Sequence, residues 1–295
     1  MTLAEHVTPP ARARRRATGA ARRSRTSLIL GLALVGTFVV VGLVSLVWTP
    51  IDPEKLDVAS RFLPPSGEHL LGTDHLGRDI LSQLMVGARK SLLIAVLATT
   101  IALVPGVTLG MVAAIRPGLI DQGILRTADV LLGFPGILLA LVLAAVMGPG
   151  NKTVIVAIVV WMVPGVTRLT RGPAKQILVT DFVSAARAYG RSRPYIVVRH
   201  VLPNVAPVVI VQASILFAVA ILIEAALSFL GLGQQRPGAS WGVMLLEAQP
   251  YVGQKPLLAV FPGVAIMLAA LGFNLLGDGL RTLLDPRQRA RATGG

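Results

Sequence analysis

Residues 28–48 read LILGLALVGTFVVVGLVSLVW, an apolar run of 21 residues without a charged side chain. A helix rises about 1.5 Å per residue, so this run is long enough to cross about 30 Å of bilayer hydrocarbon. Seven arginines precede it, as in a signal peptide, but a cleaved signal has an apolar core of only roughly 7–15 residues. The run also lacks a small-x-small cleavage motif before Trp48. We therefore expect a retained membrane helix.

Further apolar runs follow along the chain, which is 54% hydrophobic and only 14% charged. This balance is typical of multi-span membrane proteins. Pro105 and Pro135 are expected to be tolerable inside the second and third runs where neighbouring helices satisfy the freed carbonyls. Pro164 and Gly165 leave the continuity of the fourth run open. The expected fold class is an all-α polytopic membrane protein with six transmembrane helices, near 28–48, 91–115, 127–147, 153–170, 205–230 and 256–276.

The cations gather on one side of these spans, and this predicts the orientation of the chain. With the N-terminus inside, the inner segments hold 20 of the 28 Lys and Arg residues. The positive-inside rule then places both termini in the cytoplasm. The outer segment 49–90 is acidic up to Ala88. The formal charge of +14 follows from this topology, so nucleic-acid binding is not expected.

We divide the chain by its spans and loops. The parts are a basic cytoplasmic tail (1–27), the first helix with an extracytoplasmic segment (28–88), a five-helix core (89–285) with a cytoplasmic loop at 168–204, and a cytoplasmic tail (286–295). The chain has no cysteine, which excludes disulfides and thiolate metal sites. It also has no GxxxxGK[ST] phosphate loop, so it is not expected to hydrolyse ATP itself.

Glu224 is the ionisable residue that lies clearly inside a predicted span. A carboxylate facing lipid would cost about 2.5–3.5 kcal/mol, so Glu224 should face protein or a water-filled path. It either lines the substrate path or its outer gate, or it is a buried carboxyl that hydrogen-bonds between helices; the sequence leaves both open. Ser228 and Trp241 are the further candidates for the path or gate. Asp129, at the edge of the third span, is expected to pair with Arg126, one turn earlier.

Two shorter motifs predict helix caps outside the spans. Thr73 or Asp74 is expected to cap a helix that approaches the second span. A metal pair at Asp74 and His75 is the less favoured alternative, because two adjacent residues cannot close a site. None of the four histidines has a partner histidine at i+3 or i+4, so no metal site is expected. Ser240 is expected to cap a short helix that ends before Pro250, with Trp241 at the membrane boundary.

Residues 181–204 read DFVSAARAYGRSRPYIVVRHVLPN, a basic amphipathic stretch between two apolar runs. Asp181 is expected to cap a helix that begins near Phe182 and is ended by Gly190 and Pro194. A second short helix, Tyr195 to His200, then leads to the next span. The pattern alone allows two interpretations: a surface that docks another protein, or an interfacial helix that binds anionic lipid.

The spacing of small residues in this stretch favours docking. The string Ala185-Ala186-x3-Gly190-x9-His200-x-Leu202-Pro203 resembles the EAA loop of ABC importer permeases. Ser184 stands where that family usually has Glu. The resemblance assigns coupling to an ATPase to eight residues: Ser184, Ala185, Ala186, Arg187, Gly190, His200, Leu202 and Pro203.

Other blocks resemble the C-type subunit of dipeptide and oligopeptide permeases over roughly residues 28–287. They are Gly72–Asp79, Gly87–Leu92, Glu224–Gly233 with Ser240–Gly242, and Phe273–Arg281 with Leu284–Arg287. The resemblance implies a type I ABC importer permease, multi-pass in the bacterial cell membrane. It would translocate di- or oligopeptides delivered by an extracytoplasmic substrate-binding protein.

The resemblance also implies the partners. They are a second homologous permease subunit forming a heterodimer, two ABC ATPase subunits or domains, the binding protein, and the lipid bilayer. This chain would bind no cofactor, because ATP and magnesium belong to the ATPases. The alternatives are the same machinery importing nickel, haem or another small solute, a secondary carrier, and a scaffold that anchors a cytoplasmic enzyme. Sparse intramembrane charge and the lack of an internal repeat disfavour the carrier.

Overall fold

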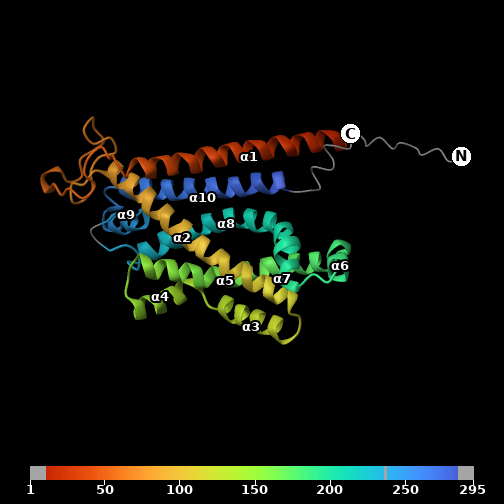
Figure 1. Cartoon of the computed structure of the whole chain (residues 1–295). Coiled ribbons are helices and arrows are strands. Elements are labelled where there is room, and N and C mark those ends of the chain that lie inside the picture. The colour runs from red at the N-terminus through yellow and green to blue at the C-terminus, as the bar shows by residue number, and fades with distance from the viewer. Residues whose placement is uncertain (1–10, 236–237, 285–295) are drawn as a thin grey trace.

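The computed structural model describes residues 11–235 and 238–284, with side chains from residue 25 onward. Over these residues the chain is mainly helical (Figure 1). The long helices are α1 (Ala11–Val44), α2 (Ile80–Ile115), α5 (Asn151–Leu178), α8 (Leu202–Phe229) and α10 (Leu257–Leu284). The shorter helices are α3 (Leu119–Gly133), α4 (Gly136–Met147), α6 (Asp181–Ala188), α7 (Arg193–Ile196) and α9 (Trp241–Ala248). Single turns lie at Val58–Ser60 and Gln249–Tyr251, and a π-helical turn spans Val197–Val201.

Five helices are long and apolar enough to cross a membrane, and the bent pair α3 and α4 makes a sixth when it is counted as one broken span. Five of the six predicted spans are thus single helices, and the predicted third span corresponds to the bent pair. Several helices extend beyond the predicted spans, and two of these extensions change the loops: α2 begins at Ile80 and α5 continues to Leu178. Arg168, Arg171 and Lys175 consequently lie on α5 rather than in the predicted loop 168–204.

The break in the bundle falls in the third span rather than the fourth. Helices α3 and α4 meet at an angle of 89°, so the prediction that Pro135 is tolerated inside a helix was wrong. Phe134 is extended, with φ −84° and ψ 132°. A residue before proline avoids the α region, and Pro135 cannot donate the next helical hydrogen bond. The fourth span is continuous, because Pro164 and Pro173 both lie inside α5.

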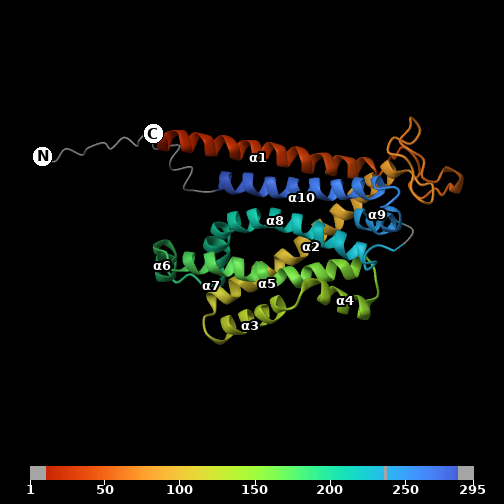
Figure 2. The ribbon, with the colours of Figure 1, turned by 180° about the vertical axis from the view of Figure 1, so that it is seen from behind.

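Helix α2 crosses the middle of the bundle and packs mainly on α5, while α1 lies antiparallel along α10 (Figures 1 and 2). Glycines allow the backbones of α1 and α10 to approach closely. A Cβ at Gly31 would lie 2.5 Å from the Leu276 nitrogen, and one at Gly279 would lie 2.6 Å from the Leu28 Cβ. Close packing through small residues is a common way for helices to associate in membranes.

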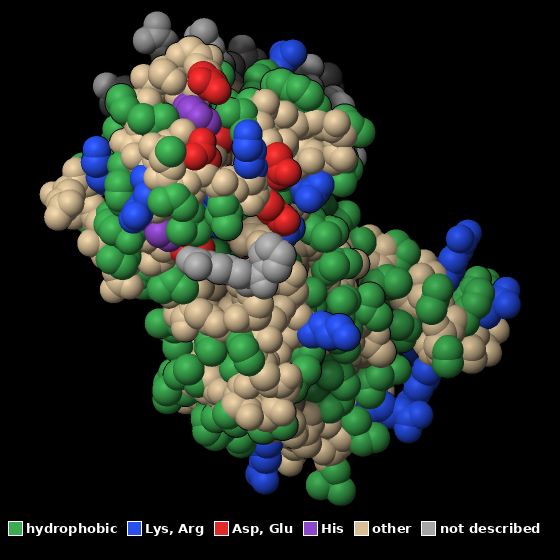
Figure 3. All heavy atoms as spheres, turned by 90° about the vertical axis from the view of Figure 1, so that its left-hand side faces the viewer, with side chains coloured by type: hydrophobic (Ala, Val, Ile, Leu, Met, Phe, Trp, Pro, Cys, Tyr) green, Lys and Arg blue, Asp and Glu red, His purple; other side chains and the backbone are tan. Residues whose placement is uncertain are grey.

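The bundle has two different ends. One end, called the α9 end here, carries α9 and the segment 49–79, and the other, the α6 end, carries α6, the start of α1 and the end of α10 (Figure 1). Seen end-on, the α9 end shows acidic side chains gathered over one part of its face, with Lys and Arg side chains among them, and a mixture of apolar and other side chains elsewhere (Figure 3). The first described residues of α1 and the last of α10 thus share a side, as an even number of crossings requires.

Candidate functional site

Helix α6, the centre of the predicted coupling loop, ends as expected but begins one residue earlier. Gly190 has φ +74°. Its N–H donates to the Arg187 carbonyl at 2.9 Å and the Arg191 N–H donates to the Ala186 carbonyl at 3.1 Å. This is the Schellman arrangement that glycine favours at a helix C-terminus. The prediction for Asp181 was wrong, because Thr180 holds the capping position and Asp181 is the first helical residue. As a carboxylate in the first turn, Asp181 still complements the helix dipole.

One buried residue seats α6 on the membrane helices. Val183 has no exposed surface and lies in a second hydrophobic cluster, separate from the main core. The other buried members are Met111 and Ala114 of α2, Ala174 and Leu178 of α5, and Ile196, Val201 and Val205 around the start of α8. The Arg187 guanidinium adds a hydrogen bond to the Leu178 carbonyl at 3.1 Å. A force on α6 therefore acts on the ends of three spans.

The outward face of α6 carries small and aromatic side chains. Ser184 and Ala185 are exposed, Ala186 is half-buried, and Phe182 and Tyr189 are exposed by 47% and 85%. The Ser184 hydroxyl donates to the Thr180 carbonyl at 3.2 Å, within its own helix. Exposed aromatics are unusual on a solvated helix and mark contact surfaces.

His200 and Pro203 shape the junction between α6 and the next span. The His200 ring packs against Phe182 of α6 and Tyr195 of α7, with ring centroids at 6.1 and 5.9 Å. The second helix expected at Tyr195 to His200 is not separate, because α7 runs through a π-turn into α8. At that turn the Leu202 N–H donates to the Val197 carbonyl, five residues back. The wider turn suits Pro203, which has no N–H and would crowd the carbonyl of a regular α-turn.

The three path or gate candidates lie together where α9 meets the spans. Exposure is 0% for Glu224, 0% for Ser228 and 1% for Trp241. The Ser228 hydroxyl donates to Glu224 Oε1 at 2.8 Å. Trp241 Nε1 donates to the Leu84 carbonyl of α2 at 3.1 Å, so this side chain lies in the core and not at the membrane boundary as expected. Glu224 has the environment of a carboxyl buried between helices, and its part in the path stays a prediction.

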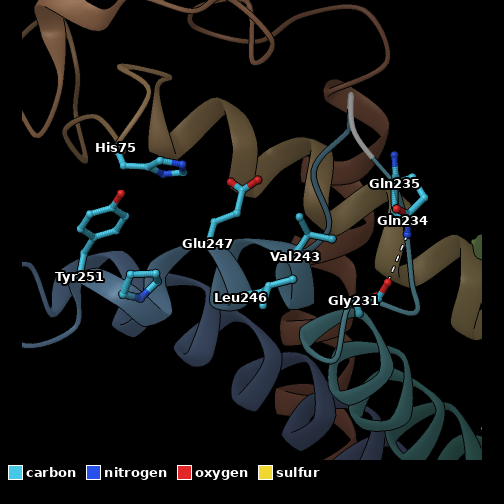
Figure 4. Close-up of a pocket in the computed structure, with 10 residues that line it drawn as sticks. His75, Gly231, Gln234, Gln235, Val243, Leu246, Glu247 and Tyr251 are labelled. Atoms are coloured by element: carbon cyan, nitrogen blue, oxygen red, sulfur yellow. Dashed lines mark hydrogen bonds between the residues drawn. The ribbon is translucent and has the colours of Figure 1, made fainter. Parts of the chain in front are cut away.

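A hollow of about 560 Å³ opens above these residues at the α9 end (Figure 4). Glu247 projects from α9 on one side, with His75 and Tyr251 beside it, and Gln234 and Gln235 stand opposite. The remaining lining residues are Ser228, Gly231, Val243, Leu246 and Pro250. The His75 and Tyr251 rings stack with centroids 5.3 Å apart. Of the three candidates for the path or gate, Ser228 is the one that lines this hollow.

An ion-pair network braces the wall of the hollow. Arg78 donates through Nε to Asp74 Oδ2 at 2.7 Å and through Nη2 to Glu247. Burial alone would lower the pKa of the Arg78 guanidinium, but the charges of Asp74 and Glu247 outweigh it and hold the pKa above its ordinary value. The network ties the segment before α2 to α9.

The same ion-pair network includes two of three side chains that lie close enough together to be considered as metal ligands. Ligand atoms of Asp74, His75 and Glu247 lie within 4.8 Å of one another. However, Asp74 Oδ1 already accepts two backbone N–H groups, from Leu76 and Arg78, and Oδ2 accepts from Arg78 and Gln83. Since Arg78 supplies the balancing cation and fills these lone pairs, the arrangement does not favour a metal ion.

The helix caps near the hollow are only partly as predicted. Asp79 caps α2 by accepting the Ser82 N–H at 2.8 Å, so the prediction of Thr73 or Asp74 was wrong. The Thr73 hydroxyl instead bonds the loop at Leu63 and Ser60. The position of Asp79, directly before the apolar run, was the signal for this cap. Ser240 caps α9 as predicted, accepting the Val243 N–H at 3.4 Å.

Comparison with known proteins decides the family. The model of the family described as "Binding-protein-dependent transport system inner membrane component" matches residues 106–290. The chain belongs to this family. Among curated inner membrane components, the dipeptide transport system permease protein DppC of Alkalihalophilus pseudofirmus is 40% identical over 262 residues, covering 89% of this chain and 86% of that protein.

Other relatives differ in the solute that their names give. The probable D,D-dipeptide transport system permease protein DdpC of Escherichia coli is 41% identical over 80% of this chain and 79% of its own length. The nickel transport system permease protein NikC of Escherichia coli is 37% identical over 89% of this chain and 95% of its own length. A solved structure of the MetNI methionine ABC transporter in an inward facing conformation has the same fold, with a TM-score of 0.58 at 20% identity, covering 69% of this chain and 96% of that one. This chain is therefore a multi-pass membrane component with the permease fold of an ABC importer.

Proposed function

We propose that this chain is one of two membrane subunits of an ATP-driven peptide importer, with the α6 end in the cytoplasm of a bacterial cell. The observation that carries the proposal is the construction of α6, which is anchored by Val183 into a cluster shared by three spans and exposes Phe182 and Tyr189 outward. A helix seated in this way passes force from a bound partner to the spans. The partners we propose for it are two ATPase subunits or domains, which hold ATP and magnesium.

Peptide is the proposed cargo because relatives at about 40% identity are named for dipeptides or peptides. A binding protein would deliver the peptide at the α9 end, where the 560 Å³ hollow lies, and a second, homologous permease would complete the path. Nickel import is the second candidate, since a nickel permease matches at 37% identity over most of both chains.

Reconstitution tests the cargo and the energy source together. With the second permease, the binding protein and the ATPases present, proteoliposomes should take up a labelled dipeptide only when ATP is supplied, and a proton uncoupler should leave uptake unchanged. Nickel uptake without dipeptide uptake would replace the proposed cargo. ATP-independent, uncoupler-sensitive uptake would instead identify a secondary carrier, and ATPase activity that ignores substrate would identify a scaffold.

The absence of cysteine allows a clean test of orientation and docking. Tyr189→Cys at the α6 end and Val58→Cys in the segment 49–79 at the α9 end introduce single thiols at side chains exposed by 85% and 64%. An impermeant maleimide added to intact spheroplasts should label position 58 and spare position 189. In permeabilised membranes a bifunctional maleimide should cross-link position 189, but not 58, to an ATPase subunit. The reverse labelling pattern would refute the orientation, and an absence of cross-links to well-labelled position 189 would refute docking.

A further inference from the structure

A second hollow, of about 600 Å³, lies beneath α6 and is strongly basic. It is formed by the last turn of α2, the last turns of α5, and α6 with α7, which lie together at one end of the bundle (Figure 2). Four of its lining residues are cations, namely Lys175, Arg187, Arg191 and Arg193. None of its lining residues is acidic, so the hollow favours an anion.

The cations of this basic hollow are only partly balanced. Lys175 shares Asp121 with Arg171, at 2.7 Å and 2.5 Å, so one carboxylate serves two cations. Arg187 bonds a backbone carbonyl, and the Arg191 guanidinium lies 4.9 Å from the centroid of the Tyr195 ring. Among the described side chains, none of the salt bridges involves Arg187, Arg191 or Arg193. Three guanidinium groups therefore remain without a carboxylate partner.

We propose that the basic hollow binds the phosphate of an anionic phospholipid headgroup. Guanidinium groups present forked donors that match phosphate oxygens. The rest of the lining is apolar, through Ile115, Leu178 and Ile196, as a site for the glycerol and upper acyl chain requires. Val179 belongs to the same apolar lining and is 80% exposed. Basic pockets between membrane helices are known sites for such headgroups.

The position of the site ties lipid binding to α6. Lys175 belongs to α5, Arg187 to α6, and Arg193 to the start of α7. A phosphate among them would bridge three elements whose buried side chains already share the cluster around Val183. The inference needs only that the α6 end meets a membrane surface, so it holds whatever solute the protein carries.

The test compares lipid binding to matched double variants of the full chain. Arg191→Gln with Arg193→Gln removes two cations from the hollow, and Arg25→Gln with Arg126→Gln removes two exposed cations outside it. Native mass spectrometry should show phosphatidylglycerol binding to the unmodified chain in preference to phosphatidylcholine with the same acyl chains. The first double variant should weaken phosphatidylglycerol binding by roughly thirtyfold, since each cation near an anionic headgroup contributes about fivefold. The control should bind as the unmodified chain does.

Several outcomes would overturn the proposal. Equal loss in both double variants would show general charge attraction, and no loss in either would show that the lipid binds elsewhere. Competition by inorganic phosphate or glycerol phosphate at the same concentration as the lipid would assign the hollow to a soluble phosphate. Loss of the lipid when the ATPases assemble would assign it to those subunits. Retention of the lipid in the assembled complex, with the same variant dependence, supports the site.

Discussion

Replacing Val183 with Asp should reduce uptake by up to about a hundredfold while leaving the membrane core folded. Val183 has no exposed surface in the hydrophobic cluster under α6. A carboxylate buried among these apolar side chains costs about 3 kcal/mol or more. That cost lowers the ratio of seated to unseated α6 by about a hundredfold, which sets the upper limit on the loss of uptake. Uptake in proteoliposomes and hydrogen exchange of the α6 amides should both report the change.

Val198→Asp is the matched control, because it makes the same substitution nearby at a side chain that is 65% exposed. It should keep uptake and α6 protection close to the unmodified protein. Exchange in α2 and α10 should stay slow in both variants, which separates unseating of α6 from loss of the fold. Normal uptake by Val183→Asp at equal membrane levels would show that α6 does not transmit force. The same loss of uptake in Val198→Asp would show that the added negative charge, and not the displacement of α6, causes the loss.

Elements with local causes were predictable from the sequence. The spans follow from long apolar runs, Gly190 ends α6 through its positive φ, and Ser240 caps α9 through its own side chain. The break at Pro135 also has a local cause in the Phe134-Pro135 pair, but the same signal at Pro164 leaves α5 continuous. A proline alone does not show whether surrounding helices hold the chain straight.

Several side-chain contacts join residues that are far apart in the chain. The periodicity of apolar residues along the sequence could not predict such pairs. Arg78 and Glu247 are 169 positions apart. Asp129 was expected to pair with Arg126, one turn away, but it pairs with Arg168 of α5 instead. That prediction was wrong because tertiary packing brings α5 alongside α3. The burial of Trp241 has the same origin, since its partner Leu84 lies 157 positions earlier.

Gly242→Ala should destabilise the protein, although helix propensity alone predicts the opposite. Gly242 lies in the first turn of α9, where Ala would favour the helix by up to about 1 kcal/mol. A Cβ there would meet the Ala225 carbonyl oxygen at 2.5 Å and the Ser228 Cβ at 2.6 Å. The helix backbone of α8 cannot move aside, so α9 must shift and loosen the Trp241 contact with α2. Overpacking of this kind costs about 2–3 kcal/mol, which lowers the unfolding midpoint by roughly 5–10 °C.

Gly263→Ala supplies the control, because Gly263 lies inside α10 and a Cβ there has nothing within 4 Å. The unfolding midpoint of the full chain in detergent should fall for Gly242→Ala and stay level or rise for Gly263→Ala. The sign of the difference is the decisive result, since both variants make the same chemical change in a helix. A rise in both would mean that α9 sits loosely on α8, and the buried contacts of Glu224, Ser228 and Trp241 would then not hold the α9 end together.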